Sequence, residues 1–294
     1  MRLTDRRHAR GRSRMVDSFL LATDVDGTLV PQGRAPESPQ AREQFCSFVS
    51  AHRIILAYVS GRSIALIKEA ITEFSLPLTD FAIGDVGTTI HARRGEAWEL
   101  DEIWSEKLTR DWDHLGGADI HALVKDHIGL QLQNAKAQSA YKQSYYVDAK
   151  ADQSSVVGAL SDSLARAGVR ASIVVSKDLS GTGLLDILPA SASKEKALEY
   201  LCENLGIARE QALFAGDSGN DIEALLCGCR AVVVSNASSE VREEVKRRAR
   251  ESGVEDCVYF AHGGYRGMNG NYAAGILEGI EFFAQRGAIR LRPR

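Results

Sequence analysis

Short apolar runs alternate with amphipathic stretches along most of this chain. Strand-like runs cover 18–23 and 53–62, and the segment 38–52 between them has apolar residues at helical spacing. A second helix-like stretch at 63–74 precedes a strand and turn at 80–92. Short strands that alternate with helices in this way are typical of an α/β fold with a mainly parallel sheet.

The same alternation returns in the last third of the chain. A helix is predicted at 193–206, and the segment 211–221 reads as a strand, a turn and the start of a helix. Two short strands follow at 231–237 and 257–261, before a closing helix at 272–285. The two outer thirds of the chain therefore predict one Rossmann-like, parallel-sheet core.

The middle of the chain has a different pattern. It holds all three tryptophans, a helix-like stretch at 154–168, the run SYYVDA at 144–149 and the strand-like run ASIVVS at 171–176. This pattern predicts a smaller α+β cap domain inserted into the core. We expect a core domain built from 17–92 and 181–294, a cap domain at 93–180, and a basic, disordered tail at 1–16.

Composition adds limits rather than a function. The chain has 294 residues, 44% of them hydrophobic and 26% charged, with a net charge of -3 and a sequence pI near 6.2. These values give no reason to expect nucleic acid or an anionic membrane as a partner. The five cysteines are odd in number and scattered, which favours free thiols in a reducing compartment, so we expect a cytoplasmic protein.

Two acids stand where the first strand ends, in the sequence FLLATDVDGT. Asp24 and Asp26 follow the apolar run directly, and Gly27 and Thr28 then begin a turn. Like charges this close repel, so one of the acids is protonated, or a cation lies between them, or both lie in water.

Other chemically active side chains follow later strands. Ser60 ends the second strand, Lys194 begins a helix after the third, and Asp217 and Asp221 follow the fourth. The carboxyl ends of parallel strands form the ligand crevice of an open α/β sheet, so these groups are expected to converge. Oxygen ligands without His or Cys favour Mg²⁺, and a cation together with Lys194 offsets the charge of the acid pair.

Each of these residues also has a plain structural interpretation. Ser60 is a good turn former before Gly61, and Lys194 could be a solvated helix charge. Asp217 and Asp221 could cap the helix that follows them, because acids are favourable at a helix N-terminus. Taken together, however, the plain interpretations require four coincidences.

Four short motifs carry a family resemblance. DVDGT, VSGR, ASKEKAL and GDSGND resemble, in order and placement, the four motifs of the haloacid dehalogenase (HAD) superfamily of aspartyl-phosphate hydrolases. The resemblance implies an Asp24 nucleophile and an Asp26 general acid and base, with Lys194 neutralising the phosphoryl group. It further implies phosphate binding by Ser60, Gly61, Lys194 and Asn220, and Mg²⁺ binding by Asp24, the Asp26 backbone carbonyl, Asp217 and Asp221.

A finer resemblance concerns the substrate. KQSYYVD, GTGLLDILP, VVVSNASSEV and AAGILEGIEFF are similar to segments of the sucrose-phosphatase family. The resemblance implies that Lys142, Tyr145 and Asp186 contact the sugar, although an amphipathic strand that packs the cap would explain the tyrosine equally well. The family usually has an acid where this chain has Leu184, so one carboxylate of that segment is missing.

The resemblance implies a Mg²⁺-dependent phosphatase that converts sucrose 6-phosphate to sucrose and phosphate. Another glycosyl-sugar phosphate, such as mannosylfructose phosphate, is the alternative within the class. A non-catalytic scaffold protein is the alternative outside it, but a scaffold has no need of a repulsive acid pair. A glycosyltransferase of the sucrose-phosphate synthase type is the candidate protein partner.

Overall fold

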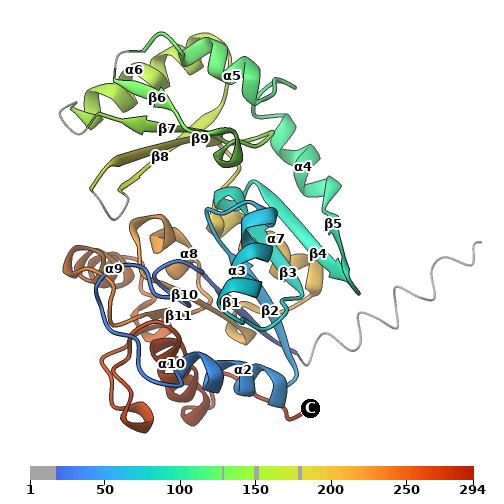
Figure 1. Ribbon diagram of the computed structural model, residues 1–294, viewed down its shortest axis with the longest axis vertical. Coiled ribbons are helices and arrows are strands. Elements are labelled where there is room, and N and C mark those ends of the chain that lie inside the picture. Colours follow the sequence, from blue (N-terminus) through green and yellow to red (C-terminus); the bar gives the residue numbers. More distant parts are fainter. Residues whose placement is uncertain (1–17, 128, 149–151, 178–180) are drawn as a thin grey trace, which may run out of the picture.

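The protein is described here by a computed structural model (Figure 1). It describes residues 18–127, 129–148, 152–177 and 181–294. The tail predicted at 1–16 lies outside the described residues. In the described part of the chain, no helix combines the length and apolarity needed to cross a membrane.

The larger of the two sheets has eight strands and forms the core, as the alternating pattern predicts. Its strand order is β12-β11-β10-β1-β2-β3-β4-β5, and the six strands from β12 to β3 are parallel. The last two strands pair antiparallel. The strands are β1 (Phe19–Thr23), β2 (Ile54–Val59), β3 (Phe81–Gly84), β4 (Thr89–Arg94), β5 (Ala97–Leu100), β10 (Ala212–Gly216), β11 (Arg230–Val233) and β12 (Val258–Phe260).

Helices cover both faces of this sheet, because successive strand residues point to opposite sides. On β1, Phe19 and Leu21 join one apolar cluster, whereas Leu20 and Ala22 join the other. The first face is covered by α2 (Ala41–Ala51), α3 (Ile64–Glu73) and α10 (Ala273–Gln285). The second face is covered by α4 (Glu102–Thr109), α7 (Lys194–Leu205), α8 (Ile222–Leu225) and α9 (Ser239–Glu251).

A four-stranded antiparallel sheet forms the cap, in the order β6-β7-β9-β8. Its strands are β6 (Leu130–Leu132), β7 (Gln143–Val147), β9 (Gly183–Pro189) and β8 (Ala171–Lys177). Tyr145 and Leu185 point into an apolar cluster with α5 (Gly117–Val124) and α6 (Gln153–Arg166). The helices lie on the side of the cap away from the core, so the opposite face of the sheet looks toward the core (Figure 1).

Short 3-10 helices connect these elements. They are η1 (Asp85–Gly87), η2 (Ala135–Ala137), η3 (Arg209–Gln211), η4 (Gly219–Asp221), η5 (Glu255–Cys257) and η6 (Tyr265–Gly267). One of them lies where functional residues were expected: η4 follows β10 and contains Asn220 and Asp221. Another, η1, follows β3.

Sheet membership differs from the predicted domain boundaries at both ends of the 93–180 segment. β5 pairs with β4 in the large sheet, although its residues fall within the predicted cap. β9 lies between β7 and β8 in the cap sheet, although its residues fall within the predicted core. Pairing between strands that are distant in sequence decides both assignments, and local patterns do not contain that information.

Candidate active site

Lys194 is the charged centre of the site. Its Nζ atom donates to Asp24 Oδ1 at 2.9 Å, to Asp221 Oδ1 at 2.7 Å and to Asn220 Oδ1 at 2.9 Å. A lysine at the first turn of a helix opposes the helix dipole, so these acceptors stabilise its position at the start of α7. The side chain is 2% exposed, so the interpretation of Lys194 as a solvated helix charge is wrong. Lys196, two residues later, is exposed.

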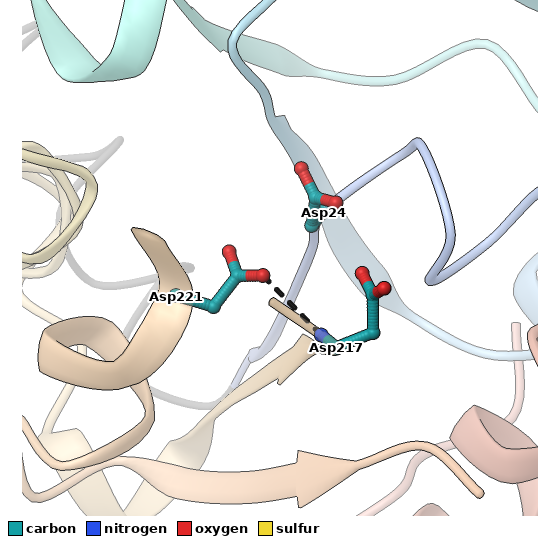
Figure 2. Close-up of side chains that lie close together, drawn as sticks. All are labelled: Asp24, Asp217 and Asp221. Carbon is teal, nitrogen blue, oxygen red and sulfur yellow. Dashed lines mark hydrogen bonds between the residues drawn. The ribbon is translucent and has the colours of Figure 1, made fainter. Parts of the chain in front are cut away.

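Three carboxylates gather beside this lysine. Asp24 follows β1, and Asp217 and Asp221 follow β10, so the parallel pairing of these strands brings the three together (Figure 2). One oxygen from each lies within 4.8 Å of the others, a spacing that fits a divalent cation. The turn after Asp26 is close-packed against this group: Gly27 has φ of +80°, and a Cβ there would lie 2.5 Å from Asp217 Oδ2.

The acids of this cluster have different surroundings. Asp221 is completely buried, and its Oδ2 accepts hydrogen bonds from the backbone N–H groups of Asp217 and Ser218. It therefore stabilises the η4 turn in a capping box with Ser218, makes no capping hydrogen bond to the helix α8 that follows, and also accepts from Lys194. Asp217 lines the cavity and accepts from Thr28 Oγ1 at 2.7 Å.

Burial dominates the electrostatics of the cluster. It raises the pKa of Asp24 well above its ordinary value, and Lys194 only partly opposes this. Burial also raises the pKa of Asp217 to about 7, with the charge of Asp221 adding to the effect. Burial alone would lower the pKa of Lys194, but Asp221 and Asp24 outweigh it and raise that pKa. The cluster is therefore short of positive charge, which a bound cation would supply.

Asp26 lies apart from this cluster and has its own cation. Arg62 donates from Nε to Asp26 Oδ2 at 2.7 Å and from Nη2 to Asp26 Oδ1 at 2.6 Å. Asp24 and Asp26 thus avoid mutual repulsion by pairing with different cations, Lys194 and Arg62. Sequence reasoning assigned no role to Arg62, although it belongs to the VSGR motif.

The predicted phosphate-binding residues face one cavity of about 470 Å³ between the core and the cap sheet. Ser60, Gly61, Lys194 and Asn220 all line it, together with Asp24 and Asp26. The structure therefore brings the predicted nucleophile, acid and phosphate-binding residues together at one edge of the large sheet, where the carboxyl ends of the parallel strands meet.

The cap supplies the other wall of this cavity. Lys142, Ser144 and Asp186 line it, and the Ser144 hydroxyl donates to Asp186 across the paired strands β7 and β9. The predicted sugar contact of Tyr145 is wrong. Its side chain is 1% exposed, packs in the cap core and shares a hydrogen bond with His121, because it points to the opposite face of β7 from Ser144.

Asn236, a residue not predicted from the sequence as part of the site, supports the turn after Asp26. Asn236 Nδ2 donates to the carbonyl of Gly27 at 2.6 Å, and Asn236 Oδ1 accepts from the backbone N–H of Tyr272. The segment VVVSNASSEV resembles a family segment, but nothing in its sequence shows which backbone group the amide contacts.

Comparisons with known proteins show which family the chain resembles. The family model described as Sucrose-6F-phosphate phosphohydrolase matches residues 17–284. A Nitrosococcus oceani protein, named as HAD-like hydrolase, is 43% identical over 270 residues, covering 92% of this chain and 72% of the relative. A mannosylfructose-phosphate phosphatase of Agrobacterium fabrum is 33% identical over 224 residues, covering 76% of this chain and 85% of the relative.

A solved structure extends the likeness to the whole fold. The sucrose-phosphatase of Synechocystis sp. PCC6803, determined in complex with sucrose and phosphate, superposes with a TM-score of 0.73. It is 26% identical, and the match covers 90% of this chain and 98% of that one.

The fold, the acid cluster and these relatives define a HAD-type sugar phosphatase, which is a phosphoric monoester hydrolase. Within that class, the chain belongs to the sucrose-6F-phosphate phosphohydrolase family, whose model covers most of its length.

Proposed function

We propose that this protein is a Mg²⁺-dependent phosphatase that hydrolyses sucrose 6-phosphate through a phosphoryl-Asp24 intermediate. The observation that carries the proposal is the buried Asp24–Lys194 pair at the base of a cavity whose opposite wall is the polar face of the cap sheet. The family match and the relatives named for sucrose and mannosylfructose phosphates support the choice of substrate class.

In the first half of the proposed reaction, an Asp24 oxygen attacks phosphorus and the bond to the sugar oxygen breaks. Lys194 orients Asp24 and offsets its charge, while Ser60 and Asn220 hold the phosphoryl oxygens. Asp26 donates a proton to the departing sugar oxygen. To carry that proton, one Asp26 oxygen gives up its hydrogen bond from Arg62. The other oxygen keeps its hydrogen bond from Arg62, which therefore orients the carboxyl group.

In the second half, water attacks phosphorus and Asp24 leaves as a carboxylate. Asp26, which has given up its proton in the first half, accepts the proton of that water, and the two hydrogen bonds from Arg62 orient its carboxylate. Asp24, Asp217 and Asp221 are the side chains that would hold Mg²⁺, with the Asp26 carbonyl completing the predicted set. When bound, the cation supplies electrostatic stabilisation of the phosphoryl oxygens.

The cap wall supplies the contacts proposed for the sugar. Asp186 is partly buried and lines the cavity beside Ser144, so it offers a hydrogen-bond acceptor to sugar hydroxyls. Leu184 lines the same wall where the family pattern has a second acid. Because this wall has one carboxylate fewer than the family pattern, mannosylfructose phosphate is the second candidate substrate. The similarity to the Agrobacterium phosphatase also favours it.

A phosphate-release assay over a panel of substrates tests the function. We expect disaccharide phosphates to exceed monosaccharide phosphates in kcat/KM, with sucrose 6-phosphate first, because a polar wall rejects substrates that leave its groups unpaired. Preference for mannosylfructose phosphate would select the second candidate. No phosphate release from any substrate, with or without Mg²⁺, would favour the scaffold alternative. A cytoplasmic location and a synthase-type glycosyltransferase partner belong to the same proposal.

Mg²⁺ should raise the melting temperature more at pH 8 than at pH 5.5. The pKa of Asp217 is raised from 3.8 to about 7, so the folded protein holds a proton that the unfolded chain has released over that range. Stability without metal therefore falls as pH rises toward 7, and Mg²⁺ competes with that proton at low pH. At about 100 times its Kd, Mg²⁺ should add about 2.7 kcal/mol, or about 5 °C.

The Asp217→Asn variant is the control for that measurement. It keeps the shape of the side chain but removes the charge, so most of the Mg²⁺-induced shift should disappear. An equal shift in the wild type and the variant, or a larger shift at pH 5.5, would remove Asp217 from the metal site.

A further inference from the structure

Lys142 extends from the cap into the core. Its Nζ atom lies 3.0 Å from the Gly61 carbonyl, to which it donates a hydrogen bond, and 3.1 Å from Asp85 Oδ1, with which it forms an ion pair. The Lys142 and Asp85 side chains are 6% and 4% exposed. A charged pair this deeply buried joins the cap sheet to the core beside the phosphate-binding loop.

The core partner of Lys142 lies in an unusual turn. Asp85, Val86 and Gly87 have φ values of 52°, 59° and 95°, so three successive residues adopt the left-handed region. Non-glycine residues persist there only when their surroundings hold them in place. The turn must therefore be fixed by its contacts, and the buried ion pair is one of them.

This turn is bound to the phosphate-binding loop through its backbone. Asp85 N–H donates to the Arg62 carbonyl at 2.9 Å, and Val86 N–H donates to the Ser60 carbonyl at 3.1 Å. Lys142 thus holds both parts of one unit, the Gly61 carbonyl directly and the turn through Asp85.

The same turn packs against the helix that begins with Lys194. A Cβ at Gly87 would lie 2.3 Å from the carbonyl oxygen of Ser193, which leaves no room for a side chain. Movement of the turn would therefore displace both the phosphate-binding loop and Lys194, the lysine that pairs with Asp24.

On the cap side, Lys142 also acts on Asp186. Burial raises the pKa of Asp186, and the positive charge of Lys142 opposes that rise. The lysine therefore stands between the acid proposed for the sugar and the acid of the core turn. Because its hydrogen bond and its ion pair are both made to the core, its ammonium group is already engaged by protein.

We propose that Lys142 is a positioning residue: its buried ion pair with Asp85 docks the cap on the core and fixes the Ser60–Arg62 loop for every substrate, rather than selecting the sugar. The inference rests on the proposed phosphatase reaction but not on which sugar is the substrate.

A double-mutant cycle tests this assignment. Lys142→Met and Asp85→Asn should each lower kcat, by roughly 10- to 100-fold. For each variant the factor should be the same with a disaccharide phosphate and with p-nitrophenyl phosphate, because a misplaced loop affects the phosphoryl group that both substrates share. Each single change leaves a buried group without its partner, whereas the double variant removes both charges. The double variant should therefore recover at least part of kcat on both substrates. Lys125→Met, which removes an exposed cap lysine, is the control and should match the wild type.

Other outcomes overturn the inference. A loss confined to the disaccharide phosphate in Lys142→Met, with Asp85→Asn unaffected, would make Lys142 a sugar ligand. Lower melting temperatures with unchanged kcat in both single variants would make the pair merely structural. If Lys142→Met does not fold, kcat of the double variant is compared with kcat of Asp85→Asn alone: a higher value in the double variant supports the docking pair, and an equal or lower value overturns it.

The test remains separate from that of the proposed function. If the wild type hydrolysed neither substrate, the proposed function would fail, while melting temperatures of the four forms would still report the docking pair. Additive losses of melting temperature would then overturn the docking role, and recovery in the double variant would support it.

Discussion

Replacing Asp24 with Asn is expected to abolish turnover while leaving the folded protein at least as stable as the wild type. The amide has the shape of the carboxylate but cannot form a phosphoryl-enzyme, so kcat should fall by roughly 10⁴-fold or more. Asp24 is 4% exposed and lies near Asp217 and Asp221, so removing its charge relieves repulsion. Lys194 keeps Asp221 as an ionic partner in the variant.

The measurements are steady-state kinetics and thermal unfolding on the same preparation. Asp256→Asn, an exposed acid of the core, is the matched control and should change neither quantity appreciably. Activity of Asp24→Asn within about 10-fold of the wild type, a loss far smaller than a missing nucleophile causes, would exclude the aspartyl-phosphate mechanism.

Replacing Asp26 with Asn should produce a loss that depends on the leaving group. General acid catalysis contributes roughly 10²–10⁴-fold, so phosphorylation by a sugar phosphate should slow by that factor. An aryl phosphate has a leaving group that needs no proton, so its phosphorylation step should slow much less. Rapid-quench kinetics of the first turnover separates this step from the later hydrolysis.

Arg62 provides the companion variant for that experiment. Arg62→Lys keeps a positive charge but loses the two parallel hydrogen bonds to Asp26, so the carboxylate is less well fixed. Its loss should follow the same dependence on the leaving group, with smaller magnitude. Equal slowing of the first step for both substrates in Asp26→Asn would show that Asp26 is not the acid.

The position of the site could be predicted from the sequence because of one simple rule. Asp24, Ser60 and Asp217 each follow an apolar strand, and parallel strands end at the same edge of a sheet. Lys194 was predicted from its motif, and its burial confirms that it is not a surface charge. The pairing of Asp26 with Arg62 was not predicted, since it depends on side-chain directions from two separate loops.

Tyr145 shows an error that the sequence itself could have prevented. Side chains alternate along a strand, so Tyr145 could not share a face with Ser144. Of the residues predicted for the sugar, Asp186 pairs with Ser144 across the strands and faces the cavity, whereas Tyr145 fills the cap core. The alternative interpretation, in which the tyrosine packs the cap, is the one the structure confirms.

The elements that could not be predicted lack a local signal. α9 has a strongly charged sequence, SEVREEVKRRARE, in which Val245 and Ala249 are buried, so its apolar stripe is too narrow to identify. β5 falls within the predicted cap but pairs with β4 in the core sheet, and β9 falls within the predicted core but pairs with β7 in the cap sheet. Long-range pairing fixed these assignments, and periodicity could not.

Trapping of the phosphoryl-enzyme tests the central claim most directly. Asp26→Asn should form the intermediate from an aryl phosphate but hydrolyse it slowly, because the base for the second step is missing. After acid quench and proteolysis, mass spectrometry should find one added phosphoryl group on the peptide that contains Asp24. The Asp24→Asn/Asp26→Asn variant should carry none. A phosphoryl group on another residue, or no modified peptide while the aryl phosphate is still consumed, would contradict the account.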